Sequence, residues 1–121
     1  MIVAGFGFRR GASAETLRAA LRLAQEGWPP VRVLAAPLDK LPALAELADT
    51  LGLSLVGITP EALAAAPTHS QSLPSLAARQ TGSVAEASAL AGAGPNAVLL
   101  TARHISPDRM ATCAIAKGTA T

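Results

Sequence analysis

The chain has 121 residues, of which 50% are hydrophobic, 15% charged and 2% aromatic. This size and apolar content predict one compact domain and exclude both two ordinary domains and a disordered chain. No apolar run approaches the ~20 residues that cross a bilayer, and the N-terminus lacks the features of a signal peptide, so we expect a cytoplasmic protein without membrane contact. The single cysteine, Cys113, and two histidines 35 residues apart offer no disulfide and no metal-ligand spacing, and we expect no metal.

The charge balance favours a small anion as ligand. The formal net charge is +2, and eight of the ten basic residues are arginine. Nucleic-acid binding usually uses a clustered basic surface with stacking aromatic side chains, so we expect no nucleic-acid partner. Arginine instead matches carboxylate and phosphate groups with its planar set of donors.

The first half of the chain alternates short apolar runs with helical periodicity. In chain order it predicts a strand over 2–6, a helix over 14–26, a strand over 31–36, a helix over about 41–51 and a strand over 53–57. Ser13 is a good N-cap for the first helix, Asp39 is a candidate cap for the second, and Gly52 is a good stop.

The second half predicts a short helix, a long irregular segment, another helix and two strands. Their ranges are 60 to just before Pro67, about 67–82, 83 to about 92, 97–101 and 111–116. Ser83 and Glu86 form a capping box in which the Glu86 side chain reaches back to the cap. The last two strands are joined by a link too short for a parallel crossover, so we expect them to be antiparallel.

This order predicts an α/β fold. We expect a single three-layer domain over residues 1–121, with an about five-stranded, mostly parallel mixed sheet, helices on both faces and one antiparallel edge.

The segment between the first strand and the first helix is the first candidate site. Its ligand-binding candidates are Gly5, Gly7, Arg9, Arg10, Gly11 and Ser13. Glycines let the backbone approach a ligand, a helix start offers free N–H groups, and two arginines add bidentate donors. The glycine spacing matches neither a dinucleotide-binding fingerprint nor a P-loop, so neither motif indicates a bound cofactor here.

Two further places supply polar side chains. Asp39 and Lys40 follow the second strand and belong near the same edge of the sheet, although Asp39 is also explained as a helix cap. Gly82, Ser83 and Glu86 open a later helix, whose capping explains Ser83 and Glu86 without a ligand. The candidates therefore lie at three helix starts.

These motifs, taken together, resemble the CobE/CbiG C-terminal domain family of cobalamin biosynthesis. The matching residues are Gly5-x-Gly7-x-Arg9-Arg10-Gly11-x-Ser13, Asp39-Lys40, Gly82-Ser83-Val84-x-Glu86-Ala87-x-Ala89-Leu90 and Thr112-x-Ala114-Ile115-Ala116. The chain begins at the first motif and ends just after the last, which predicts the free-standing form of the family. Where this family often has a cysteine, the chain has Phe8, so no thiol acts at that position.

The resemblance implies a role in cobalamin synthesis, with a tetrapyrrole-derived polycarboxylate as ligand. We expect an accessory or carrier protein that binds a precorrin or corrin intermediate, needs no cofactor, and has other cobalamin-pathway enzymes as candidate partners. One alternative is an enzyme acting on such an intermediate, with Lys40, Glu86 or His69 as acid or base. Another is a small module that binds a nucleotide or a partner protein.

Overall fold

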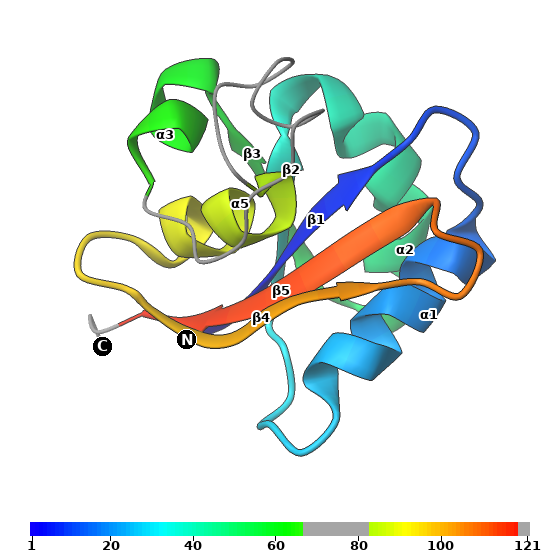
Figure 1. Ribbon diagram of the computed structural model, residues 1–121, viewed down its shortest axis with the longest axis horizontal. Coiled ribbons are helices and arrows are strands. Elements are labelled where there is room, and N and C mark those ends of the chain that lie inside the picture. The colour runs from blue at the N-terminus through cyan, green and yellow to red at the C-terminus, as the bar shows by residue number, and fades with distance from the viewer. Residues whose placement is uncertain (67–82, 119–121) are drawn as a thin grey trace.

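A mixed five-stranded sheet with helices on both faces forms the protein (Figure 1). The computed structural model describes residues 1–66 and 83–118. The strands are β1 (Ile2–Phe8), β2 (Val33–Pro37), β3 (Ser54–Ile58), β4 (Val98–Ile105) and β5 (Ala111–Lys117). The helices are α1 (Ala14–Gln25), α2 (Leu41–Leu51), α3 (Pro60–Ala65) and α5 (Val84–Ala93), with a 3-10 turn over Leu38–Lys40.

The strand order is β3-β2-β1-β5-β4. β1 pairs in parallel with β2, and β2 with β3, whereas β5 is antiparallel to both β1 and β4. Four strands therefore run in one direction, which confirms the mostly parallel mixed sheet. The last two strands are antiparallel and form one edge of the sheet, as expected, although the strand that runs against the other four is not β4 at the edge but β5 beside it. Its side chains are buried, so β5 takes an inner position, whereas β4, with Val98 56% exposed, forms the edge.

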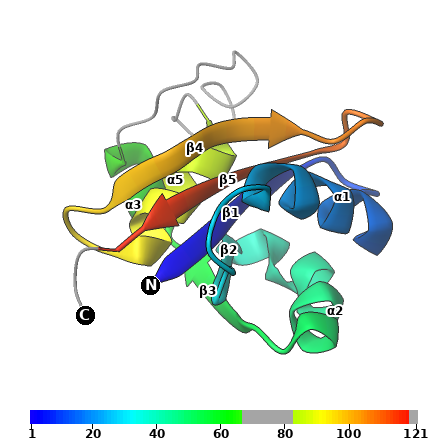
Figure 2. The same cartoon turned by 90° about the horizontal axis from the view of Figure 1, so that it is seen from below.

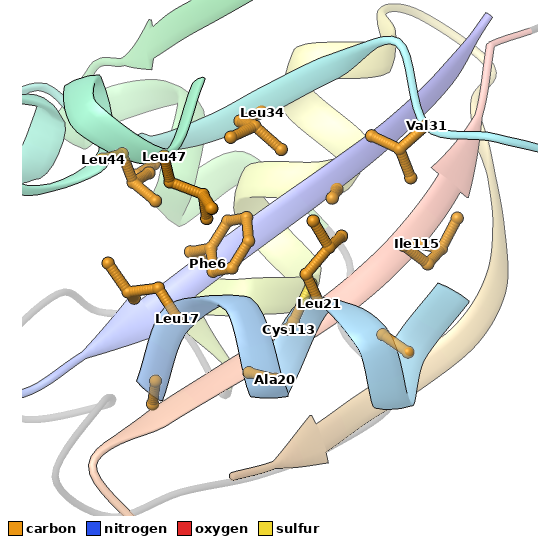
Figure 3. Packing of buried hydrophobic residues seen from close by; sticks show 14 of the residues in the cluster. Phe6, Leu17, Ala20, Leu21, Val31, Leu34, Leu44, Leu47, Cys113 and Ile115 are labelled. Carbon is orange, nitrogen blue, oxygen red and sulfur yellow. The ribbon is translucent and has the colours of Figure 1, made fainter. Parts of the chain in front are cut away.

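The helices cover the two faces of the sheet, which confirms the three layers. α1 and α2 lie on one face over a core that includes Phe6 from β1 and Leu34 from β2 (Figures 2 and 3). α3 and α5 lie on the other face, where a second cluster includes Val3 of β1 and Leu63 of α3. Alternate β1 side chains therefore enter opposite cores, as the period of a strand requires.

Two strands are longer than their sequence patterns suggest. β1 continues through Gly7 to Phe8, and β4 continues to Ile105. The β1 extension follows from its ladder with β5, which pairs every residue from Ile2 to Phe8. Glycine indicates a turn only when no neighbouring strand satisfies its backbone, and here β5 does so.

The helix boundaries agree closely with their start and stop signals. Ser13 and Thr59 cap α1 and α3 by accepting hydrogen bonds from backbone N–H groups. Gly52 ends α2 in the left-handed conformation, with a φ of 68°. Asp39 is not the cap of α2 that we expected, because the 3-10 turn makes Lys40 the N-cap residue, without a side-chain capping bond.

α5 lies unusually close to β1 because both present small residues at their contact. A Cβ on Gly5 would lie 2.2 Å from both Ala85 O and Ala89 N, so only glycine fits here. α5 thus packs backbone against backbone over the middle of the sheet.

Residues 1 and 118, the two ends of the described chain, meet where β1 begins and β5 ends. Ile2 pairs with Lys117, and the Gly118 N–H donates a hydrogen bond to Met1 O at 2.9 Å. Among the described residues, no helix is both long and apolar enough to cross a membrane.

Candidate functional site

The carboxyl ends of β1, β2 and β3 and the starts of α1 and α5 meet at one edge of the sheet (Figure 1). This is where open α/β sheets commonly bind ligands. The turn from β1 into α1 lies at this edge. It is fixed by a hydrogen bond from the Arg9 N–H to Met110 O at 2.8 Å and another from the Ala12 N–H to Arg9 O at 3.1 Å. Gly11 has a φ of 91°, which only glycine adopts readily.

Three cationic side chains gather at this end of β1. Arg9 and Arg10 are exposed, and within the described ranges neither guanidinium forms an ion pair. The Lys40 ammonium lies 5.2 Å from the centroid of the Phe8 ring, a cation–π distance that places it beside the residue preceding Arg9. Lys40 therefore lies near the end of β1 that leads to Arg9 and Arg10, and the convergence of the three charges on one ligand stays a prediction. Asp39 precedes Lys40 in the same 3-10 turn and is exposed.

Gly5 and Gly7 face α5 along the same strand. A Cβ on Gly7 would lie 3.1 Å from the Val84 Cβ and 3.4 Å from Ala85 N, so the first turn of α5 lies beside it. Close helix packing thus accounts for both glycines. Their predicted contact with a ligand stays a prediction.

The start of α5 is held by buried polar groups. Ser83 is 1% exposed, and its Oγ accepts a hydrogen bond from the Glu86 N–H at 3.3 Å, which is the expected cap. The Glu86 carboxylate is fully buried and accepts a hydrogen bond from the Arg103 N–H of β4 at 3.0 Å. Glu86 therefore joins α5 to the edge strand, a contact that its sequence neighbours do not indicate.

The remaining candidate residues are either outside the described ranges or unsuited to the chemistry considered. His69 and Gly82 lie outside the described residues. Cys113 is a buried free thiol whose pKa is raised by desolvation, so it is unsuited to nucleophilic chemistry. In the part of the chain that the structure describes, no group of three or more His, Cys, Asp or Glu residues is placed to hold a metal.

An open cavity of about 820 Å³ lies at the opposite edge of the sheet. It is lined by residues that include Pro29, Arg32, Gly52 and Ser54, at the amino ends of β2 and β3. Its walls supply one arginine and none of the candidate residues, so we place the candidate site at the carboxyl edge.

The β4–β5 hairpin contributes polar residues that the sequence analysis missed. Asp108 Oδ2 accepts a hydrogen bond from Thr16 Oγ1 at 2.5 Å, and its Oδ1 accepts bonds from Ser106 Oγ at 2.6 Å and the Met110 N–H at 3.0 Å. The bonds from Ser106 and then Thr16 hold the pKa of Asp108 below its ordinary value. No local sequence pattern indicates this contact, because the hairpin reaches the start of α1 through the pairing of β1 with β5.

The fold and the residues at the carboxyl edge of the sheet define a small three-layer α/β protein with cationic side chains where its parallel strands end. The family model described as cobalamin synthesis G C-terminus matches residues 2–116. The chain therefore belongs to the cobalamin synthesis G C-terminus family, as its motifs predicted.

Solved structures agree with this membership. The chain is 34% identical to CobE, described as a protein from the cobalamin (vitamin B12) biosynthetic pathway, with a TM-score of 0.85 over 96% of this chain and 89% of that one. It is also 34% identical to the cobalamin biosynthesis protein chiG from Agrobacterium tumefaciens, with a TM-score of 0.75 over 99% and 100% of the two chains.

A more distant likeness shows the fold alone. A cobalamin biosynthesis protein G homolog from Sulfolobus solfataricus is 21% identical, with a TM-score of 0.72 over 95% of this chain and 36% of that one. No curated protein matches the chain.

Proposed function

We propose that this cobalamin-biosynthesis family member binds a precorrin or corrin intermediate as an accessory or carrier protein. The observation that supports the proposal is that the exposed Arg9 and Arg10 directly follow Phe8 at the carboxyl end of β1, where the Lys40 ammonium lies 5.2 Å from the Phe8 ring centroid. Such intermediates carry several acetate and propionate groups. Guanidinium groups bind carboxylates through two parallel hydrogen bonds, so a cluster of them suits a macrocycle with several carboxylates.

The described residues at this edge favour binding over catalysis. The buried carboxylate of Glu86 is engaged by a backbone N–H, and the Lys40 ammonium lies over an aromatic ring. A nucleophile would need a base oriented by a third group, and within the described residues the serine at this edge with a carboxylate partner is Ser106, which donates to Asp108. Ser106 is 2% exposed and its hydroxyl also accepts the Ala111 N–H inside the hairpin, so it serves the turn and is closed to a ligand. We therefore favour a protein that holds its ligand without transforming it, in the cytoplasm.

Calorimetric and absorbance titration with hydrogenobyrinic acid and earlier precorrins tests the proposal. Measurements at about 0.1 M and about 1 M salt compare Debye lengths of roughly 10 Å and 3 Å. We expect binding that weakens at high salt and leaves the absorbance spectrum of the macrocycle unconverted. Spectral conversion would show an enzyme instead, and absence of binding would contradict the proposal.

A charge-matched pair of variants locates the site. Arg9→Ala with Arg10→Ala removes two exposed guanidinium groups, each worth up to about 1 kcal/mol, so Kd should rise about 5- to 30-fold. The control, Arg22→Ala with Arg32→Ala, makes the same change in net charge at the last turn of α1 and the opposite edge of the sheet. Equal losses in the two double variants would show that net charge, not this edge, determines the affinity.

A further inference from the structure

The β4–β5 hairpin brings another arginine to the end of the sheet where Arg9 and Arg10 lie. The hydrogen bond from the Arg9 N–H to Met110 O continues the antiparallel register of β1 and β5 by one residue. Arg10 and Arg109 are the next residues on the two segments. Both views of the fold show the hairpin beside the turn that leads into α1 (Figures 1 and 2).

The left-handed backbone at Arg109 belongs to the hairpin turn, because short hairpin loops commonly place one residue in this conformation. Its φ is 62°, in the left-handed region that glycine and asparagine occupy at lower cost. The Arg109 N–H donates a hydrogen bond to Ser106 O at 2.8 Å, which closes the turn. Any residue with an N–H could make this bond, so the turn does not require an arginine.

The hairpin is fastened to the start of α1, so its arginine is held in place. Asp108 receives hydrogen bonds from Thr16 in the first turn of α1 and from Ser106 and Met110 within the hairpin itself. Thr16 is 8% exposed and also receives a hydrogen bond from the Ser13 hydroxyl. The Asp108 carboxylate is thus occupied by three donors, and within the described residues it forms no ion pair with an arginine.

Like charges at this end raise the electrostatic free energy of the unliganded protein. Arg9, Arg10 and Arg109 are all exposed, and in the described ranges none of their guanidinium groups has a carboxylate partner. An anion that contacts the hairpin and the turn together relieves this repulsion.

We propose that Arg109 is a further anion-binding residue, which contacts a second carboxylate of the ligand bound by Arg9 and Arg10. Asp108 and Thr16 act as positioning residues, because their hydrogen bond holds the hairpin that carries Arg109 against the first turn of α1. The inference deepens the proposed function and rests on it for the natural ligand, although the site itself requires only a polycarboxylate.

Mellitate, a small hexacarboxylate, tests Arg109 without a corrin. Arg109→Gly removes the charge and accepts the left-handed backbone without steric cost, so the fold should keep its stability, whereas Arg109→Lys keeps the charge. We expect the Kd for mellitate to rise about 3- to 5-fold in Arg109→Gly and to change less in Arg109→Lys. Equal affinity of Arg109→Gly and the unmodified protein, or no mellitate binding by the unmodified protein, would overturn the inference.

A double-mutant cycle tests the positioning role. Thr16→Val removes the hydroxyl that donates to Asp108, and Thr16→Ser retains it. If the hairpin contact positions Arg109, the effect of Arg109→Gly should shrink in the Thr16→Val background and persist in the Thr16→Ser background. The same effect in both backgrounds would overturn the positioning role, since a loss of stability alone would not change this coupling.

The two proposals fail separately. Mellitate binding that depends on Arg109, together with no binding of hydrogenobyrinic acid, would overturn the proposed function and support this site. Hydrogenobyrinic acid binding that depends on Arg9 and Arg10, with mellitate affinity unaffected by Arg109→Gly, would overturn only the inference about Arg109.

Discussion

Replacing Gly5 by alanine should destabilise the protein strongly, because α5 lies directly against this residue. The added Cβ would lie 2.2 Å from Ala85 O and Ala89 N and 2.8 Å from Ala89 Cα. Ordinary van der Waals contact begins at 3.4 Å, so the strand and helix backbones must separate by about 1 Å. No flexible side chain can absorb this movement, because all three obstacles are backbone atoms.

The expected cost follows from overpacking in a dense core. Such substitutions cost about 1–3 kcal/mol, and rigid backbone obstacles place Gly5→Ala at about 3 kcal/mol or more. For a domain of this size, Tm should fall by about 10–15 °C. Urea unfolding followed by circular dichroism measures the free energy, and a thermal scan measures Tm.

Gly7→Ala is a matched control on the same strand and the same face. Its Cβ would lie 3.0 Å from the Thr112 Oγ1, which can rotate away, and 3.1 Å from the Val84 Cβ, which needs α5 to move by only a few tenths of an ångström. We expect a cost below about 1 kcal/mol. If Gly5→Ala destabilises no more than Gly7→Ala, the close helix contact does not explain Gly5. Normal stability of Gly5→Ala with lost ligand binding would instead favour the ligand contact predicted from the sequence.

Two further predictions concern buried and hydrogen-bonded carboxylates. Glu86→Ala removes the carboxylate that accepts the Arg103 N–H and should lower the free energy of unfolding by about 2 kcal/mol. Glu86→Gln keeps an acceptor oxygen, so its loss should be smaller. An unchanged urea midpoint in Glu86→Ala would refute this structural role. Hydrogen bonds from Ser106 and Thr16 lower the pKa of Asp108 in the folded state, so its contribution to stability is present above the ordinary carboxyl pKa of about 4 and is lost as pH falls through the lowered pKa. Urea titrations at about pH 7 and about pH 3 should therefore show a larger acid loss in the unmodified protein than in Asp108→Asn, and equal losses would contradict this cause.

Local signals predicted the helices well because helix ends depend on a few neighbouring residues. The cap at Ser13, the proline after Thr59 and the glycine at position 52 each act within one turn. The sheet was harder to predict, because strand order depends on pairing between distant segments. The position of β5 between β1 and β4 comes from burial in the folded protein, which no local pattern encodes.

In the candidate site too, some residues could be predicted from local sequence and others depend on distant parts of the chain. Arg9, Arg10 and Lys40 were predictable because all three follow parallel strands, whose carboxyl ends share an edge. Arg109 was not predictable in this way, because it reaches that edge through an antiparallel hairpin far along the chain. The role of Glu86 was also hidden, since its partner is a backbone N–H of β4, 17 residues away.

The contact between Gly118 and Met1 makes this fold suitable for circular permutation. The two ends of the described chain already share a hydrogen bond, so a short glycine-rich linker could join them without disturbing the β1–β5 ladder. New termini could be opened in the turn between α5 and β4, around Asn96. Because the joined ends lie at the edge opposite the arginines, a dye or an immobilising tag attached there would leave the candidate site accessible to a large macrocycle.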